Sequence, residues 1–169
     1  AVGRPFSARR AWALIMLAAG KTPDGIDAST RSKLRRQLRD HDLWSIRSKL
    51  VKRGQRITLR AHSSDVARLE SEPGATQTGA RCAVEAGLRL LAPNAPLELY
   101  VDQAMADRLV RKYRLVASRQ PNVILRIVSD EVRAWISGPL APRQAIALDL
   151  AEDLDPRAQD VAREALSGS

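Results

Sequence analysis

The chain has 169 residues, of which 44% are hydrophobic and 28% charged. This is the composition of a folded globular protein and excludes an intrinsically disordered one. The longest apolar run, AWALIMLAAG at residues 11–20, is shorter than the ~18 residues of a membrane span, so we expect a buried helix there and no membrane partner. The single cysteine, Cys82, rules out an internal disulfide and is typical of a reducing cytoplasm, where we expect the protein to act.

The net charge of +9 is confined to the first half of the chain. Residues 1–75 contain 16 Lys and Arg against 7 Asp and Glu, whereas residues 76–169 contain 12 of each kind. A basic half joined to a neutral half indicates two tasks. We therefore predict a basic helical module over residues 1–73 and a neutral α/β module, with an antitoxin or interaction role, over residues 74–169.

The basic half reads as three helices and a strand. Ser7 is a good N-cap for a helix from Ala8 to Ala19, and a second helix is predicted from Ser29 or Thr30 to Arg39, with Leu34 and Leu38 facing inward. A third is predicted from Asp42, its cap, to Arg53. The alternation in RITLRAH, residues 56–62, then predicts a half-buried strand. This order of elements is the one expected of a helix-turn-helix or winged-helix module.

The neutral half mixes helices and strands, so the predicted fold class is α+β. Strands are predicted at residues 97–101, 122–128 and, from RAWIS, 133–137, and helices at residues 64–70, 79–86 and 103–113, from Pro142, and from Asp155-Pro156 to Ser167. The last two helices have apolar faces that the domain's own sheet is expected to cover first. Spare apolar surface there could serve a partner or a homodimer.

The third predicted helix carries the pattern of a DNA-reading surface. Ser45, Ser48, Lys49 and Lys52 recur at i, i+3, i+4 and i+7, and short hydroxyl side chains beside long basic ones suit a helix in the major groove. The alternative is a solvated basic face, and the basic residues around it favour nucleic acid. The predicted nucleic-acid-binding residues are Arg31, Arg35, Arg36, Arg39, Ser45, Arg47, Ser48, Lys49, Lys52, Arg53 and Arg56.

The nucleic acid is expected to be double-stranded DNA. Readers of single strands display aromatic rings for stacking, and this half of the chain offers only Phe6, Trp12 and Trp44, of which both tryptophans are expected to pack. His41, His62 and Cys82 lack the spacing of a zinc site, and there is no P-loop, G-x-G-x-x-G or G-x-S-x-G motif. We therefore expect no catalytic residue, no metal and no cofactor.

Three stretches together resemble the AbiEi-like antitoxins and transcriptional regulators of actinobacterial type, which are found beside nucleotidyltransferase toxins. They are GRPFSARRAWALIMLAAG (residues 3–20), RAHSSDVARLESEPGATQTGA (60–80) and APRQAIALDLAEDLDPRAQDVAREAL (141–166). The resemblance implies a DNA-binding antitoxin that autoregulates its operon, with a nucleotidyltransferase-type toxin as partner.

The resemblance also leaves one alternative open. In related sequences a further small helix-turn-helix often precedes the Gly-Arg-Pro phrase, and this chain begins at Ala1 without Met. We therefore expect a fragment or a processed product. If the main DNA-binding element lies in a segment before this chain, two roles are open for the basic helices. They supply phosphate contacts only, or their basic face binds an acidic partner protein.

Overall fold

The computed structural model describes residues 3–168, and within this range the chain forms an α+β fold of seven α-helices and five strands. The helices are α1 (Ala8–Ala18), α2 (Ala28–Asp40), α3 (Val66–Glu70), α4 (Gln103–Lys112), α5 (Asp130–Trp135), α6 (Arg143–Ala151) and α7 (Pro156–Leu166). The strands are β1 (Gln55–Arg60), β2 (Thr76–Thr78), β3 (Leu97–Val101), β4 (Val116–Ala117) and β5 (Val123–Ile127). Short 3-10 turns are η1 (Arg47–Leu50), η2 (Ser63–Asp65) and η3 (Ala80–Cys82).

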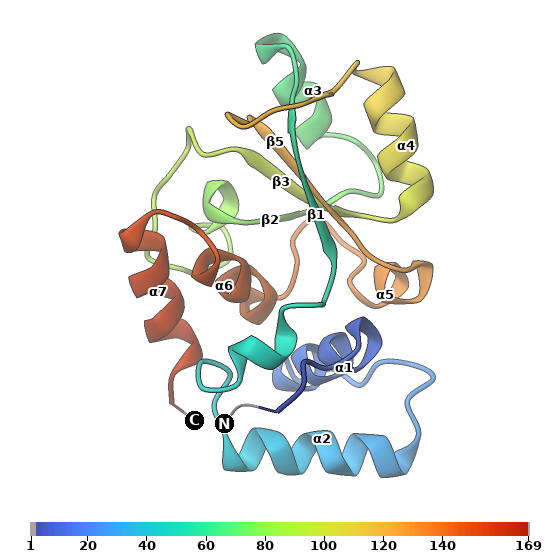
Figure 1. Ribbon diagram of the computed structural model, residues 1–169, viewed down its shortest axis with the longest axis vertical. Coiled ribbons are helices and arrows are strands. Elements are labelled where there is room, and N and C mark those ends of the chain that lie inside the picture. Colours follow the sequence, from blue (N-terminus) through green and yellow to red (C-terminus); the bar gives the residue numbers. More distant parts are fainter. Residues whose placement is uncertain (1–2, 169) are drawn as a thin grey trace.

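The strands form one mixed sheet in the order β2-β3-β5-β1-β4 (Figure 1). Strands β3 and β5 are parallel, and every other neighbouring pair is antiparallel. Because side chains alternate along a strand, Leu97 and Leu99 of β3 face α3 and α4, whereas Glu98 and Tyr100 face the side of the sheet that α1 and α6 cover.

Each face of the sheet has its own hydrophobic core. The larger core joins α1, α2, α6 and α7 to Tyr100, and the smaller one joins α3 and α4 to β1, β3 and β5. Both cores combine residues from before and after residue 73, and β1 lies inside the sheet between β5 and β4. The predicted boundary between residues 73 and 74 therefore passes through both cores. The charge bias that suggested this boundary describes only the surface of the protein.

Helix α1 anchors the larger core. The Ser7 side chain accepts a hydrogen bond from the Arg10 N–H, which caps the helix as predicted. Trp12 is fully buried, its ring meets Tyr100 edge-on at 5.0 Å, and its Nε1–H donates to the Arg53 carbonyl at 2.6 Å. Burial of the apolar run in residues 11–16 confirms the prediction of a buried helix.

The predicted third helix, residues 42–53, is wrong. Only the single 3-10 turn η1 forms, flanked by hydrogen-bonded turns. A tertiary contact replaces a helical hydrogen bond here: the Lys49 carbonyl, which an α-helix would pair with the Arg53 N–H, accepts from the Phe6 N–H instead. The Trp44 N–H donates to the Leu166 carbonyl, which ties the start of this segment to the end of the chain. The Ser45 hydroxyl also bonds to the Asp42 carbonyl, a local competitor of the helical pattern.

Other differences concern short elements. RAWIS is the end of helix α5 and not a strand, since Ser129 caps that helix by accepting from the Val132 N–H. The predicted helix at 79–86 is reduced to η3 and turns. The short strands β2, of three residues, and β4, of two residues, were not predicted. The strands at 97–101 and 123–127 and the helices capped by Asp102 and Asp155 are confirmed. None of the helices within residues 3–168 combines the length and the apolar composition that a membrane span requires.

Candidate nucleic-acid interface

Helix α2 presents its charged side away from the body of the protein. Leu34 is buried and Leu38 half-buried against the larger core, which leaves the opposite side of the helix to solvent. That side carries Ser32, Arg35, Arg36 and Arg39, at i, i+3, i+4 and i+7. Helix α2 thus carries one serine and three arginines at the same spacing that was predicted for the serines and lysines of the third helix. Helix α2 lies at one end of the molecule, beyond α1 (Figure 1).

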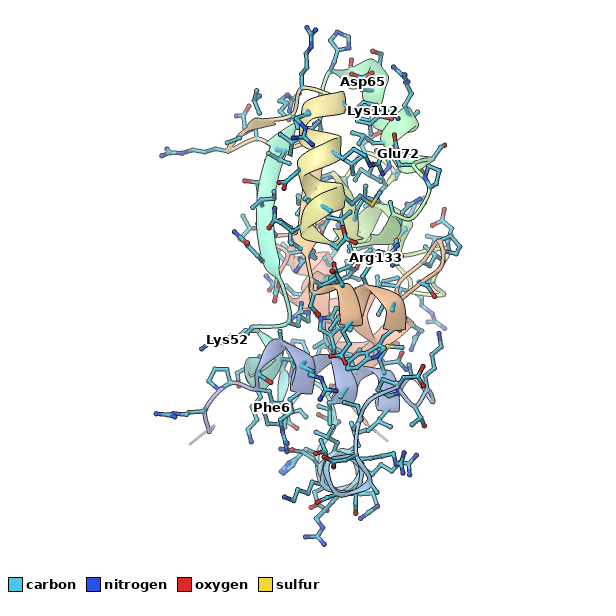
Figure 2. The ribbon with its side chains drawn as sticks, turned by 90° about the vertical axis from the view of Figure 1, so that its right-hand side faces the viewer. Phe6, Lys52, Asp65, Glu72, Lys112 and Arg133 are labelled. Carbon is cyan, nitrogen blue, oxygen red and sulfur yellow. The ribbon has the colours of Figure 1, made fainter. Side chains whose placement is uncertain are left out.

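The start of α2 is fixed by an N-cap. Asp27 caps the helix, since its carboxylate accepts from the Thr30 N–H at 2.6 Å, and this bond lowers the pKa of Asp27. Arg39 lies in the last turn, where a cation interacts favourably with the carbonyl end of the helix dipole. Figure 2 views α2 almost end-on at the bottom, with side chains spreading into solvent around it.

The turns that replace the third helix add further cations next to α2. The Arg47 guanidinium lies 3.7 Å from the centroid of the Trp44 ring and donates to the Trp44 carbonyl. Lys49 lies over Phe6 at 5.4 Å, and Lys52 projects from the side of the molecule in Figure 2. Ser45 and Ser48 are exposed, but Ser45 no longer shares a helical face with Ser48 and Lys49.

Each of the two aromatic rings of this region lies between one cation that is near in the sequence and one that is distant. Trp44 is flanked by Arg163 of α7 at 5.3 Å as well as by Arg47, and Phe6 by Arg10 at 5.1 Å as well as by Lys49. Sequence reasoning missed Arg10 and Arg163. Arg10 lies four positions after Phe6, a spacing that could have been noticed, whereas no local pattern marks Arg163, which lies 119 positions after Trp44. Guanidinium groups held on aromatic rings are pre-oriented donors for phosphate.

We define the basic surface as the exposed cations of α2 and of the turns that follow it. Residues 28–52 contain eight Lys and Arg against two Asp. Within the described residues, no ion pair forms with the following side chains of this surface: the exposed Arg35, Arg36, Arg39, Arg47 and Lys52 and the half-buried Arg31 and Lys49. An excess of unpaired cations over acids raises the local concentration of anions and attracts a polyanion.

Arg53 does not belong to this surface, contrary to the sequence prediction. Its side chain is only 3% exposed and donates to Asp149 Oδ1 at 2.6 Å, with Glu152 at 3.0 Å as a second partner. Its Nε atom has no hydrogen-bond partner in the described residues. A buried charge requires a partner, and Arg53 is held by the acids of α6 where phosphate cannot reach it.

Asp149 is the centre of a buried ionic network. Besides Arg53 it accepts hydrogen bonds from the Tyr100 and Thr78 hydroxyls, and Arg126 lies 3.2 Å away. Burial disfavours its charged form, but Arg126 and Arg53 outweigh burial, so the pKa of Asp149 is lowered. Both of its oxygens are occupied, which makes this network a structural clamp between the sheet, α6 and the turns after α2.

Arg126 extends the network to Glu98 and Glu152. Its Nε–H donates to Glu98 and its Nη1–H to Glu152, each at 3.0 Å. Burial raises the pKa of Glu98 despite the neighbouring guanidinium. Among the residues that the structure describes, no group of three or more His, Cys, Asp or Glu side chains is arranged to hold a metal ion.

Arg56 lies on β1, away from α2. In the sheet it is paired with Arg126, and its exposed side chain lines a cavity of ≈ 370 Å³ between the sheet and the corner that joins α6 to α7. The structure therefore divides the predicted residues into three sets: the basic surface, the buried Arg53, and Arg56 at the sheet.

Comparisons of this chain with protein-family models, with curated proteins and with solved structures found no match.

Proposed function

We propose that this protein is a DNA-binding transcriptional regulator that contacts duplex DNA through the basic surface. The observation that carries the proposal is the outer side of α2, where Arg35, Arg36 and Arg39 are exposed and in no ion pair of the described chain. Cationic side chains that form no ion pair within the protein are available to bind phosphates.

The dimensions of α2 support contact with a duplex. Its 13 residues span about 20 Å, and the major groove, about 12 Å wide, admits an α-helix. Because α2 lies at the end of the molecule, its outer side approaches DNA without interference from the sheet (Figure 1). Ser32 permits close approach between the arginines, whose guanidinium forks bind phosphate or the guanine edge.

The test is a change in the salt dependence of binding. The variant Arg35→Gln/Arg36→Gln/Arg39→Gln should flatten the slope of log affinity against log salt by about 2 to 3, because each phosphate contact to B-DNA releases about 0.9 of a counterion. The control Arg68→Gln/Arg111→Gln/Arg114→Gln removes the same charge at the α3 and α4 end, opposite α2 in Figure 1, and should keep the wild-type slope. Both variants should keep the wild-type melting temperature, since exposed charges contribute little to folding.

Two results would contradict the proposal. If the α2 variant and the control change the slope equally, binding follows net charge and not this surface. If this chain binds no duplex at all at low salt, α2 is a solvated face.

The resemblance to AbiEi-like proteins supports the finer proposal that the regulator is the antitoxin of a toxin–antitoxin pair and acts in the cytoplasm on its own operon. Its partner is then a nucleotidyltransferase-type toxin. Co-expression tests this: the chain should restore growth to cells that produce the toxin encoded beside it, and failure to restore growth contradicts the antitoxin role but not DNA binding.

A further inference from the structure

The outer edge of β1 is only partly paired. Strand β5 pairs with β1 from Gln55 to Leu59, whereas β4 pairs only with Leu59 and Arg60. The Thr58 carbonyl accepts from the Ser118 N–H at 3.2 Å, so the backbone groups of Thr58 point away from β5. Since these groups alternate along an antiparallel strand, the N–H and C=O of Arg56 also point outward, and within residues 3–168 no strand pairs with that side of Arg56.

The side chains at this edge are cationic on one face of the sheet. Arg56 and Thr58 line the ≈ 370 Å³ cavity together with Arg119, and the described chain forms no ion pair with either arginine. The acids of the opposite wall are engaged: Glu152 in ion pairs with Arg53 and Arg126, and Asp153 Oδ1 with the Asp155 N–H. Two arginines without an ion pair in the described chain, Arg56 and Arg119, therefore face one carboxylate without an ion pair, that of Asp153, so positive charge is in excess beside the open edge.

Apolar groups flank the same edge. On the other face of the sheet Ile57 is only half-buried, at the margin of the smaller core. Leu154, at the corner between α6 and α7, lines the cavity and is 95% exposed. The corner is held by hydrogen bonds, among them Gln159 Nε2–H to the Asp153 carbonyl, so a leucine is presented to solvent on an ordered turn. A single exposed leucine is common on protein surfaces, so Leu154 and the half-buried Ile57 supply apolar contact area beside the edge without marking an interaction site by themselves.

We propose that the outer edge of β1 binds an extended acidic segment of a partner protein, which adds to the sheet as a strand beyond the end of β4. An acidic residue opposite Arg56 pairs with that guanidinium, and an apolar residue opposite Ile57 covers it. A protein backbone supplies the donors and acceptors in the alternating order that a strand edge requires, which a polynucleotide does not. This inference goes beyond the proposed function and uses residues outside α2.

Amide hydrogen exchange tests the edge in the free protein. The N–H groups of Arg56 and Thr58 should exchange rapidly, as solvated amides do, while those of Ile57 and Leu59, which point at β5, should be protected. Equal protection at all four positions would mean that the edge is already covered, and would overturn the proposal.

Binding is tested with a fluorescein-labelled peptide of eight residues in which Glu and Val alternate. In the proposed register the amides of the Glu residues point at β1, and the Glu opposite Arg56 donates to the Arg56 carbonyl. N-methylation of the Glu amides should therefore abolish binding. N-methylation of the Val amides, which point away from β1, should preserve it. The peptide with Lys in place of Glu should bind at least roughly tenfold more weakly, because it places like charges opposite Arg56. Equal binding of the two N-methylated peptides would refute strand addition.

Two protein variants separate this proposal from DNA binding. Arg56→Ala/Arg119→Ala should weaken peptide binding by roughly tenfold and keep the salt slope for DNA, since neither residue lies on α2. The variant Arg35→Gln/Arg36→Gln/Arg39→Gln should bind the peptide with unchanged affinity. Displacement of the peptide by duplex DNA, together with loss of DNA binding in Arg56→Ala/Arg119→Ala, would instead assign this edge to nucleic acid and overturn the proposal.

Discussion

Replacing Asp149 by Asn should destabilise the protein more than any exposed substitution. The Asp149 side chain is fully buried and accepts hydrogen bonds from Arg53 at 2.6 Å, Tyr100 at 2.7 Å and the Thr78 hydroxyl. Asn retains the shape but loses the charge, and its NH₂ group faces donors. Two buried guanidinium groups then share only Glu98 and the partly exposed Glu152.

The magnitude follows from this arrangement. Breaking a buried ion pair by removing one partner costs about 3–5 kcal/mol, out of the roughly 5–15 kcal/mol by which domains are stable. For a chain of this length each kcal/mol shifts the melting temperature by about 2–4 °C, so a decrease of roughly 6–20 °C is expected. Since the pKa of Asp149 is lowered by folding, the deficit should be full above about pH 4 and shrink below it.

Urea unfolding at pH 7, followed by tryptophan fluorescence and circular dichroism, measures the change. Trp12 reports on the larger core, because its Nε1–H bonds to the carbonyl of Arg53 itself. The control Asp160→Asn removes an exposed carboxylate from α7 and should change the free energy of unfolding by less than about 0.5 kcal/mol. A loss below about 1 kcal/mol for Asp149→Asn would refute the view that this network clamps the turns after α2 to the sheet.

Three further predictions concern single residues. Gly79 and Gly74 share a positive φ of 82°, but only at Gly79 would an added Cβ lie 2.7 Å from Glu98. Gly74→Ala should therefore lower the free energy of unfolding by about 1–2 kcal/mol, and Gly79→Ala by about 1–3 kcal/mol more, as measured by urea unfolding. Equal losses of stability in the two variants would contradict the close approach at Gly79. Hydrogen bonds from Lys112 and Tyr113 lower the pKa of Glu72 from 4.5 to about 2. The charged carboxylate therefore stabilises the fold above pH 4.5, and this contribution is lost as the pH falls toward 2. Glu72→Gln should be less stable than wild type at pH 7, and an acid titration of stability should show the difference vanishing near pH 2. Burial raises the pKa of the Cys82 thiol to about 12, so a disulfide reagent at pH 8 should modify native protein only at the rate of unfolding, and rapid modification would show that the thiol is accessible.

Elements with a local signal were predictable from the sequence. A cap followed by an apolar stripe defined α1, α4 and α7, through Ser7, Asp102 and Asp155, and period-two alternation or an apolar run defined β1, β3 and β5. In these elements the tertiary contacts agree with the local pattern, since each buries most of the apolar side chains that the pattern placed inward. The exposed cations of α2 follow from the same reasoning, since Leu34 and Leu38 define its inner side.

The tertiary structure alone decided the region from Asp42 to Arg53. The residues there have a helical pattern, but the backbone partners of Trp44 and Lys49 are Leu166 and Phe6, from the two ends of the chain. Burial of Arg53 depends on Asp149, which lies 96 positions later. Asp149 is the one charged residue in the run of residues 145–150, which are all buried, and this pattern in the sequence could have been noticed. The sequence determined by itself how much positive charge the protein carries and on which short elements. Which of those charges face solvent depended on acids from distant segments, because burial of a cation is stable only where the fold brings an anion to it.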